Sequence, residues 1–285
     1  MSQGTNQGWS PPHGPTSERD PRDTPNYTLR EASGLLEVPR STLAAWVKGR
    51  SYETQQGERR WPALLGVGKG RLLSFHNLVE LQVLAALRRE HGVSVPKVRE
   101  ALGYLRDKLG VERPLLHRAF LVDHGCNLFV EHYGHLIEAS ASGQVAMRAV
   151  LAEYLKTLDY DEAGWVRAWK PIPYAGMVSL DPLVAFGRPV LVGTRLPVEV
   201  LCDGFLAGDS PESLAESYQE PAERVEQALR LSFRRPRRAG EGLAGLAAQA
   251  VGEWRRGEAL AQVARAHDCP VGDVQGWILQ AYQAA

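Results

Sequence analysis

Long apolar runs are absent from this chain of 285 residues, and cysteine is scarce. No stretch reaches the roughly 18 consecutive apolar residues that a membrane-spanning helix needs. The three cysteines, Cys126, Cys202 and Cys269, are odd in number and far apart, which argues against a disulfide framework and is typical of a reducing cytoplasm. The opening stretch MSQGTNQGWSPPHGPTSERD lacks an apolar core, so we expect no secretory signal.

Net charge is also absent, because 33 basic residues balance 33 acidic ones. No global field therefore indicates nucleic acid or a membrane surface as a partner, and any such signal must be local. Apolar residues make up 44% of the chain, as in ordinary soluble globular proteins. The length allows one to three domains, and we expect a cytoplasmic protein.

Patterns that would support catalysis, a metal or a nucleotide are missing too. His124, Cys126, His132 and His135 lie close together, but a metal site needs about four converging ligands, and on a strand His132 and His135 would point to opposite faces. The segment GRPVLVGTR resembles a phosphate loop only in its glycines and lacks the Gly-Lys-Ser/Thr ending. We therefore expect no metal, no cofactor and no enzymatic activity.

Composition divides the chain into segments. Residues 1–26 are rich in Pro, Gly, Ser and charge, and they predict a disordered arm. Helical periodicity follows over Leu29–Leu36, Ser41–Val47, Phe75–His91 and Val95–Leu109. Residues 111–175 combine short apolar stretches, glycine turns and one helix, and they predict a small central α/β body. From Val198 the pattern is helical again, interrupted by RRPRRAGEG (234–242), which we interpret as a basic linker. The predicted fold class is α+β, mostly α.

One pattern occurs three times in the chain. LREASGLLEVPRSTLAAWV (29–47) and LAQVARAHDCPVGDVQGWI (260–278) align without a gap, with proline and tryptophan at matching positions. A third copy, PESLAESYQEPAERVEQAL (211–229), keeps the proline but replaces the tryptophan with alanine. Three occurrences at this length predict a recurring unit of two short helices around a proline turn.

The first copy has the features of a helix-turn-helix. Thr28 and Glu31 predict a capping box at the start of the first helix. Pro39 can precede a second helix, whose residues Leu43, Trp46 and Val47 share one apolar face. The second helix of such a motif can enter a major groove of DNA. A helical hairpin that merely has proline in its turn is the simpler alternative.

Local charge favours DNA binding by the first copy. Between Arg40 and Arg71 there are seven basic and two acidic residues, and residues 49–71 are Gly-rich and polar, which suits a β-loop that lies along the phosphate backbone, a wing. The expected DNA-binding residues are Arg40, Ser41, Thr42, Ala45, Lys48, Arg50, Arg59, Arg60, Lys69 and Arg71. We expect the first four near base edges, and Arg59, Arg60, Lys69 and Arg71 on phosphates.

The other two copies carry different charges. Between Glu199 and Leu229 there are eight acidic residues and one base, so we expect that DNA repels this segment and that it binds a basic protein or is simply a solvated acidic face. The C-terminal copy is weakly acidic. A candidate second DNA contact there comprises Gly272, Asp273 and Gln275 with Arg234, Arg235, Arg237 and Arg238, although the arginines suit a solvated linker equally well.

Residues 27–233 resemble a known family. Tyr27–Val47 followed by LSFHNLVELQVLAALRREHGVSVPKVREALGYL is similar to the MerR-like helix-turn-helix of some VapB-type antitoxins. The segment VSLDPLVAFGRPVLVGTRLPVEVLCDGFLAGDSPESLAESY resembles the conserved domain of unknown function that accompanies it. The residues that match this motif are Asp181, Pro182, Gly187, Pro189, Gly193, Thr194 and Arg195.

The resemblance implies a domain plan and a function. The expected domains are a MerR-like winged helix-turn-helix (27–110), the central body (111–175) and an antitoxin-associated helical domain (176–233). The repeated pattern, outside the resemblance, adds a helix-turn-helix-like unit (243–285) after the linker, and we expect the last two domains to be homeodomain-like three-helix units. The resemblance implies an antitoxin that neutralises a PIN-like ribonuclease toxin and represses its own operon. From the local charge we expect it to bind double-stranded DNA, as a homodimer joined through Val95–Leu109 or the central body, and to be nucleoid-associated when bound. One alternative is a stand-alone regulator that bridges DNA through two binding units, which the C-terminal copy favours. Another is an adaptor that does not bind DNA.

Overall fold

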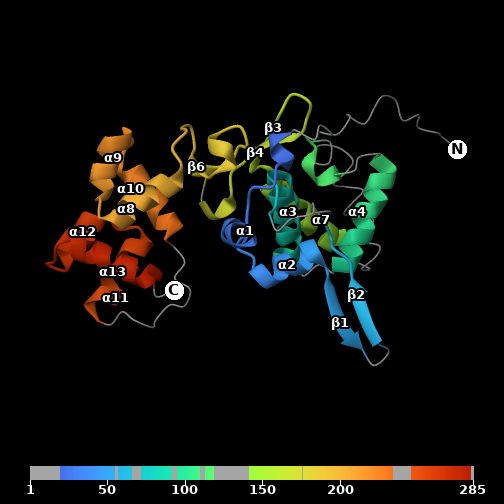
Figure 1. Cartoon of the computed structure of the whole chain (residues 1–285), viewed down its shortest axis with the longest axis horizontal. Coiled ribbons are helices and arrows are strands. Elements are labelled where there is room, and N and C mark those ends of the chain that lie inside the picture. Colours follow the sequence, from blue (N-terminus) through green and yellow to red (C-terminus); the bar gives the residue numbers. More distant parts are fainter. Residues whose placement is uncertain are drawn as a thin grey trace. The chain divides into compact units, whose positions relative to one another are not determined.

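The computed structural model describes residues 20–54, 57–65, 72–91, 95–109, 113–118, 141–174, 176–233 and 245–283. These residues are mostly helical, with small two-stranded sheets, which agrees with the predicted α+β class (Figure 1). The chain divides into two compact units. The first comprises Met1–Pro173 with Asp181–Leu183, and the second comprises Tyr174–Leu180 with Val184–Ala285.

The first unit begins with the two helices of the first repeat copy. Helix α1 (Leu29–Leu36) has the predicted capping box, in which the Thr28 side chain accepts from the Glu31 amide and Glu31 accepts from the Thr28 amide at 2.6 Å. Glu37 ends α1 in the left-handed conformation, with φ of 53°. Pro39 then precedes helix α2 (Arg40–Lys48), and its carbonyl oxygen accepts from the first turn of that helix. A proline at this boundary costs no helical hydrogen bond, because the first amides of a helix have no partner within it.

A β-hairpin follows α2. Gly49 has a φ of 75°, which a side chain would strain, and it turns the chain into β1 (Arg50–Thr54). Strand β2 (Gly57–Trp61) pairs with β1 in antiparallel register, so that Arg50 lies opposite Trp61 and Tyr52 opposite Arg59. The hairpin falls inside the segment for which the sequence predicted a β-loop.

The core of the first unit is built around α3 (Phe75–His91). Residues 73–87 are buried without exception, so α3 is enclosed on all sides over most of its length. It packs against α7 (Ala141–Leu155) and α1. Helix α4 (Val95–Leu109), η2 (Pro114–Leu116) and the strands β3 (Leu158–Tyr160) and β4 (Val166–Trp169) complete the unit. The strands predicted over 119–140, with Cys126 and three of the histidines, lie outside the described residues.

Residues 20–26 are folded, which corrects the prediction of a disordered arm for this part of it. They include η1 (Pro21–Asp23), in which the Arg22 guanidinium pairs with Asp20 at 2.8 Å and with Asp161 at 2.6 Å. Asp23 pairs with the buried His76 at 2.9 Å and with Arg113 at 2.7 Å. Burial alone would raise the pKa of Asp23, but His76 and Arg113 outweigh it and lower that pKa. Composition could not predict that residues 20–26 are folded, because their fold depends on charged partners that are distant in sequence.

The second unit is helical apart from a short β-turn structure at its start. Its small elements are η3 (Ile172–Tyr174), of which only Tyr174 belongs to it, β5 (Val178–Ser179), η4 (Ala185–Gly187) and β6 (Val190–Leu191). Six helices follow in the described residues, namely α8 (Val198–Ala207), α9 (Pro211–Tyr218), α10 (Ala222–Ser232), α11 (Leu246–Arg256), α12 (Leu260–Ala266) and α13 (Val271–Gln283). All six lie in the region from Val198 onward that the sequence predicted to be helical.

Candidate nucleic-acid interface

Helix α2 separates a buried face from an exposed one. Leu43, Trp46 and Val47 are buried, as predicted from their spacing. The opposite side of the helix carries the residues predicted to approach DNA. Arg40, Ser41 and Lys48 are exposed, and Thr42 and Ala45 are partly exposed. The face therefore has hydroxyl and guanidinium groups accessible to solvent on a helix that is fixed to the core by its other side.

The basic side chains beside this face have no partner within the described part of the chain. Arg40, Lys48, Arg50 and Arg60 are exposed, and none makes a hydrogen bond or an ion pair to any described residue. Arg22 and Arg113 of the same unit, by contrast, are both neutralised by carboxylates. Cations that are unpaired and exposed keep their full capacity to bind an anion, because they need not first leave a carboxylate.

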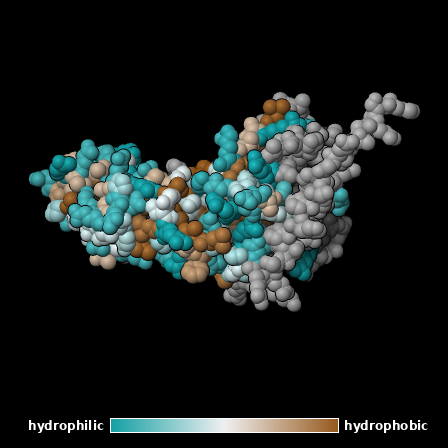
Figure 2. Space-filling view, turned by 90° about the horizontal axis from the view of Figure 1, so that it is seen from above, coloured by the Kyte–Doolittle hydropathy of each residue, from teal (hydrophilic) through white to brown (hydrophobic). Residues whose placement is uncertain are grey.

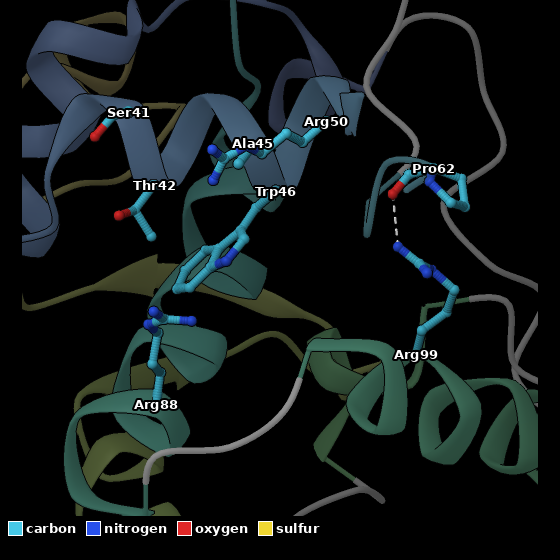
Figure 3. A pocket seen from close by; sticks show the side chains of 8 residues that line it. All are labelled: Ser41, Thr42, Ala45, Trp46, Arg50, Pro62, Arg88 and Arg99. Atoms are coloured by element: carbon cyan, nitrogen blue, oxygen red, sulfur yellow. Dashed lines mark hydrogen bonds between the residues drawn. The ribbon is translucent and has the colours of Figure 1, made fainter. Parts of the chain in front are cut away.

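The exposed face of α2 forms one wall of a hollow of about 250 Å³, which we call the arginine hollow (Figure 3). Arg50 of β1 and Arg88 of α3 lie on opposite sides of the Trp46 side chain in this view. Arg99 of α4 donates to the Pro62 carbonyl oxygen at 2.6 Å. The described lining residues, none of which is a carboxylate, are Ser41, Thr42, Ala45, Trp46, Arg50, Pro62, Arg88 and Arg99. Its surface is cationic and rich in hydrogen-bond donors, so it suits an anion such as a phosphate.

Arg88 is a candidate that the sequence pattern did not indicate. Its neighbour Arg89 is used internally and donates to the Tyr154 hydroxyl and the Leu36 carbonyl oxygen, both at 3.1 Å. Arg88 is exposed and makes no hydrogen bond or ion pair to a described residue. An exposed arginine near the end of a helix is ordinary, and Arg88 lies outside the basic segment 40–71. Only the fold brings it beside α2.

The hairpin residues are described in part. Arg60 is exposed and lies opposite Ser51. Arg59 lies opposite Tyr52 in the backbone register of the hairpin. Lys69 and Arg71 lie outside the described residues.

The candidate second DNA contact has a different character. Gln275 is buried, and its amide donates to the Phe205 carbonyl oxygen at 2.8 Å and to that of Asp209 at 3.1 Å. Its role in the structure is therefore internal, and the prediction of Gln275 as a DNA contact does not fit its position. Gly272 and Asp273 are exposed but bring one acid and no base. Arg234, Arg235, Arg237 and Arg238 lie outside the described residues.

The motif residues between Asp181 and Arg195, which match the conserved domain of unknown function, form turns. The Asp181 side chain accepts from the Leu183 amide at 2.9 Å, and Pro182 is the turn residue between them. Gly187 and Gly193 have φ of 78° and 80°, where other residues would be strained. The Thr194 hydroxyl donates to the Leu191 carbonyl oxygen and accepts from the Leu196 amide. Pro189 offers its carbonyl oxygen to the first amide of α8, and Arg195 is exposed. The motif residues thus have a structural explanation, with Arg195 the exception.

The helices of the second unit expose acids. In Figure 2 the left-hand lobe, which is α8–α13, presents a mostly hydrophilic face. The exposed carboxylates of α8, α9, α10 and their connections are Glu199, Asp203, Asp209, Glu212, Glu216 and Glu223. Arg188 pairs with Glu199 at 2.9 Å, and the others make no ion pair to a described residue. This surface is electrostatically opposite to the face of α2.

Other chemistry finds little support in the described residues. No three His, Cys, Asp or Glu side chains there are grouped as a metal site would require. Burial raises the pKa of Cys202 to about 11, so its thiol is protonated and unreactive at neutral pH. None of the described helices is both long enough and apolar enough to cross a bilayer.

Parts of the chain are similar to a known family and to known proteins. The family described as "Protein of unknown function (DUF433)" matches residues 178–231. A Mycobacterium tuberculosis (strain ATCC 25618 / H37Rv) protein named "Putative antitoxin VapB45" is 29% identical over 231 residues, covering 73% of this chain and 93% of that protein. "Uncharacterized protein Rv2308" of the same strain is 26% identical over 215 residues, covering 71% of this chain and 88% of its own length. Much of this chain is therefore similar to nearly the whole of two mycobacterial proteins, one of which is named as an antitoxin.

A solved structure shares the fold. The crystal structure of Rv2018 from Mycobacterium tuberculosis matches with a TM-score of 0.56 at 24% identity, covering 73% of this chain and 98% of that one. At this identity the likeness concerns the fold alone.

Proposed function

We propose that this chain is an antitoxin-like DNA-binding regulator. The observation that carries the DNA-binding part is the set of exposed cations around the exposed face of α2 that pair with no described residue. The similarity to VapB45, together with the DUF433 match, supports the antitoxin part. In this proposal α1, α2 and the β1–β2 hairpin act as a MerR-like winged helix-turn-helix.

The proposed mechanism divides the first unit between base contacts and phosphate contacts. Helix α2 enters the major groove, with Arg40, Ser41, Thr42 and Ala45 near base edges. Lys48, Arg50 and the wing residues Arg59, Arg60, Lys69 and Arg71 bind the phosphate backbone. The arginine hollow seats one further phosphate, because Arg50 and Arg88 approach it from two elements and its described lining includes no carboxylate. Phosphate contacts fix the register of the helix, and base contacts then give specificity.

The proposed partners follow from charge. The acidic surface of α8–α10 attracts a basic protein, which in an antitoxin is the toxin, here a PIN-like ribonuclease. A homodimer, held together by α4 or the central body, doubles the DNA site and matches a palindromic operator. A small PIN-like reading frame beside this one would support the toxin, and reversing the exposed α9 charges with Glu212→Lys and Glu216→Lys would then abolish its co-purification.

A binding titration tests the DNA part. The probe is a duplex that spans the region upstream of the chain's own reading frame, titrated with the full chain at several salt concentrations. For the variant Arg40→Ala/Arg50→Ala/Arg60→Ala we expect at least a tenfold decrease in affinity and a salt slope lower by about 0.9 for each phosphate that is no longer neutralised.

The control removes the same number of charges from the second unit. Arg195→Ala/Arg256→Ala/Arg265→Ala changes three exposed arginines there and leaves both quantities unchanged. Equal decreases in the two triple variants would mean that net charge, not the α2 face, determines binding. Unchanged affinity in the first variant would sink the DNA-binding proposal.

The bridging alternative has less support. It needs a second DNA-binding face on α13, where Gln275 is buried and the exposed residues Gly272 and Asp273 offer no cation. Its remaining support is the recurrence of the helix–turn–helix shape.

A further inference from the structure

The six described helices of the second unit form two halves with the same design. The first half is α8–α10 and the second half is α11–α13, side by side in Figure 1 in orange and red. A shift of 49 residues aligns them, so that Phe205 corresponds to Trp254 and Pro221 to Pro270. Under this shift Val198–Ala207 falls on residues 247–256, which coincides with α11 except for its first residue. The likeness therefore extends beyond the two-helix pattern that the sequence showed, to all three helices.

The corners of the halves agree in detail. Gly208 ends α8 with a φ of 110°, and Gly257, its counterpart, ends α11 with a φ of 119°. Gln219 follows α9 at a φ of 56°, and its counterpart Asp268 lies at 49°. Positive φ is unfavourable for residues other than glycine, so its recurrence at the same corner indicates the same tertiary geometry in both halves.

The halves meet through equivalent residues. The rings of Phe205 and Trp254 are stacked, with centroids 6.4 Å apart and planes at 5° to each other. Each is the other's counterpart under the shift. Two equivalent residues face each other in this way only at the axis of a two-fold interface, in which both partners present the same surface.

Polar contacts cross the interface in both directions. Glu226 and Gln275 are counterparts, and both are buried, at 7% and 6% exposure. Gln275 donates to the carbonyl oxygens of Phe205 and Asp209 in the first half. Glu226 accepts from the Trp254 indole at 3.0 Å and from the Leu260 amide in the second half.

Arg230 completes the symmetry. It donates to the carbonyl oxygens of Trp254 and Glu258, at 2.6 Å and 3.0 Å. These two residues are the counterparts of Phe205 and Asp209, whose carbonyl oxygens Gln275 binds. The same two acceptors at the end of the first helix are therefore covered in each half by a side chain from the other half.

We propose that the α8–α10 face that binds α11–α13 is a self-association surface, and that the second half occupies it in place of a second copy of the first half. The DUF433 match ends at residue 231 and thus includes the first half only. The occupant of this face has the same fold as the half that carries it, the counterparts Phe205 and Trp254 stack on each other, and the same two carbonyl positions are covered in each half from the other, so we infer that the face can also bind a second copy of its own half. In the full chain α11–α13 covers this face, so two full chains must associate through other surfaces.

The test is to detach the second half, α11–α13, from the first half by mutation. Gln275→Glu places a carboxylate against the carbonyl oxygens of Phe205 and Asp209, and Trp254→Ala added to it also removes the stacked ring. The full chain and both variants are compared by sedimentation for mass and by hydrogen exchange for detachment of α11–α13. We expect detachment and a doubling of the mass relative to the parent chain.

The symmetry supplies a second variant. Between two first halves, Arg230 of one chain would bind the Phe205 and Asp209 carbonyl oxygens of the other, so Arg230→Ala in the Gln275→Glu background lowers the mass again. Detachment without a rise in mass would overturn the proposal. So would a second half that stays bound in the double variant, because the equivalent contacts would then not be what joins the halves.

Discussion

Helices α2 and α10 occupy equivalent places in two copies of one pattern, yet they use their polar residues differently. Each follows a left-handed corner, at Glu37 or Gln219, and a proline. The cations beside α2 pair with no residue that the structure describes, whereas Arg224 of α10 is bound to Glu220 and the Val192 carbonyl oxygen, and Arg230 to the second half. The same backbone thus serves an open surface in one place and an internal joint in the other, and it is the partners of the side chains that distinguish the two.

The largest expected effect comes from the carboxylate of the internal joint. Glu226→Ala leaves the Trp254 indole and the Leu260 amide without their acceptor and removes the carboxylate that pairs with Arg230. Removing one member of a buried ion pair typically costs about 3 kcal/mol. We expect the free energy of unfolding of the second unit to fall by about that amount in urea titrations followed by tryptophan fluorescence. Unchanged stability would show that this joint does not hold the halves together.

A matched pair of arginine variants tests the comparison directly. Arg88→Ala removes an unpaired cation, so we expect about a tenfold decrease in DNA affinity and a salt slope lower by about 0.9, with unchanged stability. Arg224→Ala removes a guanidinium that is hydrogen-bonded internally, so we expect stability to fall by about 1.5 kcal/mol and DNA affinity to stay unchanged. The measurements are a duplex titration and a urea titration of each variant. If Arg88→Ala lowered stability and Arg224→Ala lowered DNA affinity instead, the distinction between the open surface beside α2 and the internal joint at α10 would be wrong.

The smallest expected effect concerns pH. Burial raises the pKa of Glu226 above 4.5, despite the opposing effect of its hydrogen bonds and Arg230. The folded unit therefore binds this proton more tightly than the unfolded chain does, and the contribution of Glu226 to stability is lost as the pH rises through the raised pKa. Glu226→Gln removes the titration, so the stability difference between variant and parent changes between pH 7 and pH 4.5. A difference that is constant over this range would contradict the raised pKa.

Local signals in the sequence predicted most of the helices. The capping box at Thr28, the proline before α2 and the apolar spacing of Leu43, Trp46 and Val47 all act within one or two turns, and the structure confirms each. The three copies of the pattern were also visible, because their corners and prolines recur at fixed distances.

Contacts between distant residues could not be predicted in this way. Order in residues 20–26 depends on Asp161, His76 and Arg113, which are far along the chain. Arg88 joins the candidate site only because α3 passes beside α2. Gln275 was predicted as a DNA contact, but the first half, α8–α10, packs against that position. Each case depends on tertiary packing, on which the local pattern carries no information.

The missing cap of α12 has a consequence for how the chain is made. Ala259 cannot accept a hydrogen bond through its side chain, and Glu226 of α10 takes the Leu260 amide instead. Ser210, by contrast, caps α9 from within its own half. A ribosome releases α10 before α12, so the acceptor is already in place when the helix that needs it emerges. For this one contact, the acceptor is therefore synthesised before the amide that depends on it.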